Sequence, residues 1–179
     1  MRDMSLHILD IAENSVRAGA SLVEIEVTQD AGADTLAISV RDNGRGMDDP
    51  AMKKADPFFT SKEGKRFGLG LPLLRQAAEE CGGRFELESE PGRGTYVRAE
   101  FQLSHPDLKP MGDMGATVAT LVQSRPEMDF VFRHTLNGDA CELDTRSIRP
   151  EIEGLPLDTP AVLGYIKQNV NDCIRRAHV

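Results

Sequence analysis

Polar side chains near the start of the chain recur at a spacing that would gather them for metal binding. Residues three and four positions apart share one face of a helix, and this pattern joins His7, Asp10, Asn14 and Arg17, with Glu13 beside them. The side-chain carbonyl of Asn14 is a ligand of the kind that Mg²⁺ prefers, together with waters and phosphates. A solvated helix face held by a Glu13–Arg17 ion pair explains the same pattern, so both interpretations are open at this point.

A second candidate site is the stretch Gly68-Leu69-Gly70-Leu71, which opens a predicted helix. Glycines let backbone N–H groups approach an anion, and a helix N-terminus adds partial positive charge. A tight turn is the simpler explanation of Gly-x-Gly alone. Lys62, Lys65 and Arg66 precede it, however, on a chain of net charge −8. This local cationic cluster favours an anion-binding loop.

A third stretch, RDNGRGM (41–47), follows the alternating apolar side chains of Leu36, Ile38 and Val40. Asn-Gly is typical of a two-residue hairpin turn. The same glycines would also let a ligand lie against bare backbone. The stretch by itself does not distinguish the two.

The elements that would position these residues follow from periodicity and from the Gly and Pro breaks. A long segment without regular period (47–67), with one short helical piece at 50–55, interrupts them; loops of this length inside a compact unit are usually functional. The first hundred residues therefore predict a two-layer α/β sandwich with a mainly antiparallel, four-stranded sheet and two helices. The predicted helices are 4–18 and 71–80, and the strands lie around 23–27, 36–40, 85–87 and 97–101.

The composition changes at 104–110, and we predict a boundary between units 1–104 and 105–179. The second unit is predicted to contain a helix at 113–124, a hairpin of 129–135 and 140–144, and a helix that begins at 158–160. It contains no cluster of residues typical of a site. Partner docking, self-association as a homodimer, and inert packing on the sheet are all open for it.

Composition limits the class of protein. Of the 179 residues, 40% are hydrophobic and 28% charged, which is typical of soluble globular proteins. The acidic balance disfavours nucleic acid and anionic membrane as partners, and the N-terminus does not have the pattern of a secretory signal. Cys81, Cys141 and Cys173 are odd in number and widely spaced, which predicts reduced thiols and a cytoplasmic protein.

Five stretches in order resemble the GHKL, or Bergerat-fold, ATP-binding superfamily. This superfamily includes type II topoisomerases, mismatch-repair ATPases, heat-shock chaperones, sensor histidine kinases and anti-sigma-factor kinases. The resemblance spans about residues 4–103. The stretches are ENSVRAGA (13–20), DNGRGM (42–47), PFFTSK (57–62), GLGL (68–71) and GRGTYV (92–97).

The resemblance implies ATP and Mg²⁺ as ligands and gives individual residues roles. Asn14 would bind Mg²⁺, and Asp42 would accept a hydrogen bond from the adenine amino group, so RDNGRGM would line a pocket. Residues 48–67 would form a lid packed by Phe58 and Phe59, with Lys62 near phosphate. Gly44 and Gly46 would pass close to the base, Gly68, Leu69 and Gly70 would bind phosphates through backbone N–H groups, Thr95 would lie near the adenine edge, and Met47, Phe59, Thr60 and Leu71 complete the predicted ATP site.

One departure affects the predicted chemistry. Hydrolytic branches place a glutamate four residues before the metal-binding asparagine, whereas this chain has Asp10, whose carboxylate is set back by about 1.5 Å. A displacement of about 1 Å can cost ~10²-fold in rate. Asp10 and Glu13 are the candidate catalytic residues, and Glu13 would support the metal shell. The prediction is a signalling kinase that acts on a separate protein, with ATP hydrolysis or ATP sensing as alternatives.

Overall fold

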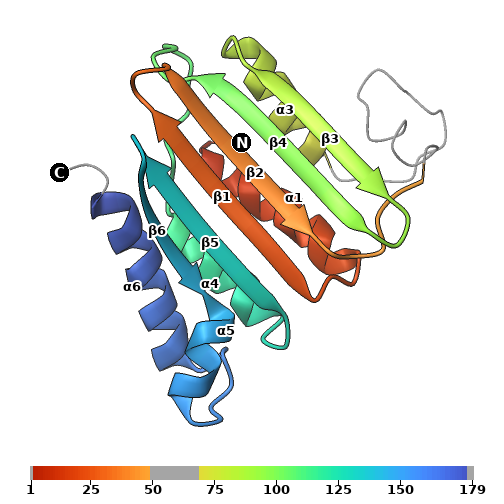
Figure 1. The fold of residues 1–179 in the computed structure, drawn as a ribbon, viewed down its shortest axis with the longest axis vertical. Helices are drawn as coiled ribbons and strands as arrows, with labels where there is room; N and C mark the ends of the chain where they lie inside the picture. Colours follow the sequence, from red (N-terminus) through yellow and green to blue (C-terminus); the bar gives the residue numbers. More distant parts are fainter. Residues whose placement is uncertain (1, 49–68, 177–179) are drawn as a thin grey trace.

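The computed structural model describes residues 2–48 and 69–176, and Figure 1 shows their arrangement. The first part contains α1, two strands, a helix and two more strands; the second adds a helix, a hairpin and three helical segments. The elements are α1 (Met4–Arg17), β1 (Leu22–Asp30), β2 (Thr35–Asp42), α3 (Gly70–Glu80), β3 (Arg84–Glu90), β4 (Gly94–Gln102), α4 (Met114–Ser124), β5 (Asp129–Leu136), β6 (Asp139–Asp144), α5 (Thr145–Ile148), the 3₁₀ turn η1 (Arg149–Ile152) and α6 (Pro160–Arg176).

The strands form one six-stranded sheet in the order β3-β4-β2-β1-β5-β6. Neighbouring strands are antiparallel except β1 and β5, which run parallel with Leu22 opposite Asp129. The predicted α/β sandwich with a mainly antiparallel sheet is therefore confirmed. The sheet is wider than the four strands expected from the first hundred residues, because β5 occupies the edge of β1.

Helices α1, α3 and α4 cover the same face of the sheet (Figure 1). The apolar side of α1 supplies Met4, Ile8, Ile11 and Ala12, all at most 3% exposed. Alternate residues of the strands point toward these helices, because side chains of a strand alternate between its two faces. The result is one continuous apolar core to which elements on both sides of residue 104 contribute. The division at 104 stays a prediction, and its two parts share a sheet.

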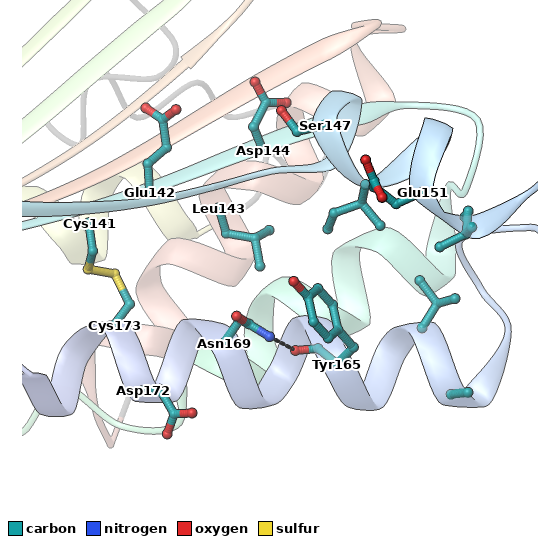
Figure 2. Close-up of a pocket in the computed structure, with 14 residues that line it drawn as sticks. Cys141, Glu142, Leu143, Asp144, Ser147, Glu151, Tyr165, Asn169, Asp172 and Cys173 are labelled. Carbon is teal, nitrogen blue, oxygen red and sulfur yellow. Dashed lines mark hydrogen bonds between the residues drawn. A yellow bond between two sulfur atoms is a disulfide. The ribbon is translucent and has the colours of Figure 1, made fainter.

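The second part corrects two expectations. Cys141 of β6 and Cys173 of α6 form a disulfide, with 5.8 Å between their Cα atoms, whereas only Cys81 is a free, buried thiol. The prediction of three reduced thiols was wrong because Cys141 and Cys173 are 32 residues apart along the chain, and this separation does not reveal that they are close in the fold (Figure 2). Residues 145–152, for which no element was predicted between the hairpin and the last helix, form α5 and η1. The helical piece predicted at 50–55 lies outside the described residues.

None of the helices in the described part of the chain is long and apolar enough to span a bilayer.

Candidate functional site

The centre of the candidate site is Asp42, the last residue of β2. Leu36, Ile38 and Val40 alternate toward the helices, and Asp42 continues this alternation, so its carboxylate points inward and the residue is only 8% exposed. Ser15 Oγ of α1 donates to one carboxylate oxygen at 2.6 Å, and the Gly44 N–H donates to the other at 2.8 Å. A carboxylate can accept about four hydrogen bonds. Each oxygen of Asp42 therefore keeps acceptor capacity for a ligand.

The loop after Asp42 is held by contacts to several elements and is not a hairpin turn, because β2 pairs with β1 and β4. The side chain of Asn43 accepts from the N–H groups of Ser21 and Leu22 at the start of β1. Arg45 N–H donates to a carbonyl at the end of α1, and Gly92 N–H donates to the Arg45 carbonyl at 2.7 Å. These bonds hold the backbone of the loop between α1 and the β3–β4 turn.

Two glycines of this region occupy positions that larger residues could not. Gly46 has φ +66° and Gly94 has φ +93°, in the left-handed region that favours glycine. A Cβ at Gly46 would overlap the Glu90 carbonyl, and one at Gly94 would overlap the Asp42 carbonyl. The loop and the start of β4 thus pack backbone against backbone beside Asp42.

Thr95 lies next to Asp42, its partner across the β2–β4 ladder. A 2.9 Å hydrogen bond joins its hydroxyl to Ser89 Oγ of β3, and Ser89 also accepts from the Met47 N–H at 2.8 Å. Thr95, Ser89 and Met47 therefore form one polar connection between the sheet and the end of the loop.

Asn14 and Glu13 lie on α1, one turn beyond Asp10. Both are half-buried, and Arg17 contacts both: its guanidinium donates to Asn14 Oδ1 at 3.1 Å and to Glu13 at 2.9 Å. The Glu13–Arg17 pair of the solvated-face interpretation is therefore present. Because Arg17 is 63% exposed, the pair contributes little to stability. Asn14 Oδ1 retains one lone pair.

The N-terminus of α3 lies against Asp10. A Cβ built on Gly70 would be 3.0 Å from Asp10 Cβ and 3.6 Å from its Oδ2, so glycine allows this close approach. None of the described side chains caps the N-terminus of α3, and Leu69 before it is 72% exposed. Leu71 packs partly against the core. The N-terminus of α3 thus lies beside Asp10 of α1 and has no capping side chain among the residues described.

His7 does not belong to the solvated face on which its spacing placed it. Its side chain is 1% exposed, and neither ring nitrogen has a hydrogen-bond partner among the residues described. Burial, reinforced by the positive charge of Lys109, lowers the pKa of His7 from 6.5 to about 4. The ring is therefore neutral at physiological pH and packs in the interior.

Sequence reasoning did not identify Ser15 and Ser89, although a signal was present. Ser15 continues the apolar stripe of Ile8, Ile11 and Ala12, and Ser89 continues the inward-facing positions of β3. When a serine occupies a position that the helix or strand period otherwise fills with apolar residues, its buried hydroxyl requires a hydrogen-bond partner. Here those partners are Asp42 and the loop end at Met47.

The residues of the candidate site lie from the middle of α1 to its C-terminal end: Gly70 lies close to Asp10, and Asn14 follows one turn later. Ser15 binds Asp42, which pairs with Thr95. Within residues 2–48 and 69–176, no three His, Cys, Asp or Glu residues gather as a ready metal site. A metal ion held here would therefore depend on ligands from a bound phosphate and from water. The predicted contacts from Phe59, Thr60, Lys62 and Gly68 lie outside the described residues.

Comparison with known proteins agrees with this arrangement. Residues 2–105, more than half of the chain, match the model of the family described as "Histidine kinase-, DNA gyrase B-, and HSP90-like ATPase". The chain belongs to this family. The match covers α1 to β4 and therefore every element of the candidate site. The predicted GHKL membership is confirmed.

Two relatives of this chain are named as kinases. The chain is 39% identical over 90 residues to the sensor protein kinase FleS of Pseudomonas aeruginosa, and 33% identical over 96 residues to sporulation kinase C of Bacillus subtilis. These segments cover 49% and 53% of this chain but only 22% of either kinase. The similarity is thus to one part of much longer proteins.

A solved structure supports the fold. The N-terminal domain of a DNA repair protein aligns with a TM-score of 0.51 at 16% identity, covering 80% of this chain and 53% of that one. This coverage extends beyond residue 105, so part of the likeness includes the second half of the sheet. At this identity the likeness concerns architecture alone.

Proposed function

We propose that this family member is a signalling kinase that binds ATP with Mg²⁺ and phosphorylates a separate protein. The observation that carries the proposal is Asp42: a buried carboxylate, fixed by Ser15 and Gly44, with acceptor capacity left on both oxygens. It lies at the junction of α1, β2 and β4, within the segment that matches the family. The similarity to two protein kinases supports transfer to a protein.

Adenine would bind against Asp42, beside the loop 43–47 and the start of β4. Its exocyclic amino group is a donor, and a buried carboxylate is the strongest neutral-pH acceptor that a side chain offers. Guanine presents a carbonyl at the corresponding position, which Asp42 would repel. A hydrogen bond to a charged group contributes about 1.5–3 kcal/mol, so Asp42 would discriminate between the two bases. Thr95 would lie at the edge of the same pocket.

The phosphates would extend toward Gly70. The uncapped N-terminus of α3 offers N–H groups and a partial positive charge to an anion. The amide oxygen of Asn14 fits Mg²⁺ by its chemistry and its remaining lone pair, provided that the exposed Arg17 turns away. Bound Mg²⁺ would neutralise charge on the phosphates. The chain itself would orient the nucleotide and place its terminal phosphate for in-line attack by the acceptor side chain.

ATP hydrolysis is the second candidate, and the position of Asp10 favours it. Its carboxylate lies beside the N-terminus of α3, where the terminal phosphates would lie. Asp10 would then hold a water for attack. Its short side chain predicts slow turnover. If ATP is bound but neither hydrolysed nor transferred, the protein is a nucleotide-sensing switch.

Calorimetric titration of the protein with ATP and with GTP, both with Mg²⁺, tests the nucleotide site. Asp42→Asn replaces a charged acceptor by a neutral one, and we expect a loss of about 1–2 kcal/mol in ATP binding, or about 5–30-fold, with GTP much less affected. Asp107→Asn, which removes an exposed carboxylate outside the site, is the control and should bind as the wild type does. Equal loss for both nucleotides, or no loss, would refute the role of Asp42.

The fate of the terminal phosphate separates the three activities. ATP labelled at the γ-phosphate is incubated with the protein alone and with an extract of its source cells. Label on a second protein supports the kinase, and free phosphate from the protein alone supports the hydrolase. Tight ATP binding without either product supports the switch and excludes both enzymes. Asp10→Ala should abolish free phosphate but leave transfer largely intact.

A further inference from the structure

A row of polar side chains crosses the end of the sheet beside Asp42. The strands β3, β4 and β2 lie side by side (Figure 1), where Ser89 is the partner of Thr95 and Thr95 is the partner of Asp42. Residues directly opposite each other on neighbouring strands point to the same face of the sheet, so all three side chains lie on the face that α1 covers. The next row along the same strands is apolar and consists of Leu87, Val97 and Val40. The change from apolar to polar side chains thus marks the end of the sheet at which Asp42 lies.

The Ser89 hydroxyl uses its complete hydrogen-bonding capacity within this row and the adjacent loop. A serine hydroxyl has one proton to donate and two lone pairs that accept. The Gly94 carbonyl, which can only accept, lies 2.9 Å from Ser89 Oγ and takes the proton. The Met47 N–H, which can only donate, occupies one lone pair at 2.8 Å. The remaining contact, 2.9 Å to Thr95 Oγ1, must then be a bond that Thr95 donates.

The direction of this bond fixes what Thr95 can offer to a ligand. Its hydroxyl proton is committed to Ser89, and both lone pairs of Oγ1 stay available, because none of the other groups in the described part of the chain donates to it. Asp42 beside it is likewise limited to accepting, with Ser15 and Gly44 as its donors. The side chains of Asp42 and Thr95 therefore present acceptors and no donor to a ligand that lies against them.

We propose that Ser89 is a positioning residue that sets the base specificity of the nucleotide site by holding Thr95 as an acceptor. This inference rests on the proposed nucleotide site, whose choice of base it explains. The exocyclic amino group of adenine carries two N–H groups, so a pair of acceptors, Asp42 and Thr95, suits both of them. Hypoxanthine has a carbonyl in place of this amino group and would bring a third acceptor toward the other two. Without Ser89, the Thr95 hydroxyl could turn and donate to that carbonyl.

Titration calorimetry with ATP and with inosine triphosphate, both with Mg²⁺, tests the proposal as a ratio of two affinities. Ser89→Ala should narrow the preference for ATP about 2–12-fold, the range that one neutral hydrogen bond contributes. Ser89→Thr retains a hydroxyl and should keep the wild-type ratio. Ser124→Ala is the matched control and should also keep the ratio, because it removes another serine bond to a carbonyl, that of Leu121 at the end of α4.

A second background separates positioning from a general structural effect. In Thr95→Val, which has no hydroxyl to orient, the additional change Ser89→Ala should leave the ratio unchanged. A general loosening of the strands would instead alter the ratio in both backgrounds. An unchanged ratio in Ser89→Ala with Thr95 present, or an equal change in both backgrounds, would overturn the proposal.

Amide exchange of the nucleotide-free protein gives a readout that does not depend on binding. Ser89→Ala should speed up exchange of the Met47 N–H, since the acceptor of this group is lost, whereas Ser89→Thr should not. Unchanged exchange of Met47 in Ser89→Ala would contradict the hydrogen bonds from which the role of Ser89 follows. If the wild type binds neither nucleotide, the nucleotide site itself is refuted, and this inference with it. If the wild type prefers ATP and Ser89→Ala keeps that preference, only the role of Ser89 is refuted.

Discussion

Protonation of His7 should destabilise the fold, and the structure gives the size of the effect. The ring is 1% exposed and has no hydrogen-bond partner among the described residues. The charged ring that forms on protonation would therefore have no hydrogen-bond acceptor for its two N–H groups. Burial first, and then the positive charge of Lys109, lower its pKa from 6.5 to about 4; Asp3 opposes this effect only partly. Leucine at position 7 would fill similar space without titrating.

The sign follows from proton binding. Between pH 6.5 and about 4, the unfolded chain protonates His7 whereas the folded protein does not, so stability falls as the pH drops through this window. At ~1.36 kcal/mol per pKa unit, the complete shift corresponds to about 3.4 kcal/mol. Integrating between pH 7 and pH 5 gives a loss of about 2 kcal/mol from this single group.

Urea unfolding at pH 7, 6 and 5 measures the effect as the difference in the free energy of unfolding between the wild type and His7→Leu. From pH 7 to pH 5, the wild type should lose about 2 kcal/mol more than His7→Leu, since all other groups titrate in both. His105→Gln, at a partly exposed histidine, should follow the wild type. Parallel pH profiles for wild type and His7→Leu would show that His7 is not buried as described, and the packing of α1 would need revision.

Three further changes test the site and the second part of the chain. Gly70→Ala should weaken ATP binding severalfold while altering unfolding by less than about 1 kcal/mol, because the methyl would move α3 away from Asp10; unchanged affinity would contradict a phosphate site there. Ser15→Ala removes the buried hydrogen bond to Asp42 and should cost about 1.5–3 kcal/mol in urea unfolding, together with ATP affinity. Reduction of the disulfide should lower stability by about 3–4 kcal/mol. Cys173→Ser should have the same low melting temperature with or without reductant, and a wild type that does not respond to reductant would argue against the bond.

Elements whose pattern is local were predictable from the sequence. The apolar stripe of α1 and the alternation in β1 to β4 gave both type and approximate bounds, because one face of each element packs on the core. α4, the β5–β6 hairpin and α6 followed from the same signals and from Asn137-Gly138, both of which have positive φ. The missed elements α5 and η1 lack such a period, and the missed disulfide joins two elements that are 32 residues apart.

The arrangement of the site was predictable only in part. Resemblance gave Asp42, whereas the inward alternation of β2 gives the reason that its carboxylate is buried. The hydroxyls that hold it in place were not found, since the partner of Ser15 lies 27 residues away and the partner of Ser89 depends on how β3 and β4 pair. His7 was placed on the wrong side of α1 because helical spacing alone does not say which of two neighbouring faces packs inward.

The pairing of strands that are far apart in the sequence could not be predicted from local patterns, and it has the largest consequence for the architecture of the sheet. Without β5, strand β1 would be an edge strand over Leu22–Gln29, with its N–H and C=O groups unpaired beside the loop that holds Asp42. Parallel pairing requires a long crossover, which the chain supplies through α4 before β5. Residues 129–136 of β5 therefore provide the strand that pairs with this edge of β1. This addition closes the edge of β1 near the candidate site and makes β6 the last strand of the sheet, with α6 alongside it (Figure 1). Because an unprotected edge strand can pair with other chains, the position of α6 beside β6, tied to it by the Cys141–Cys173 disulfide, protects the edge that the second half of the chain creates.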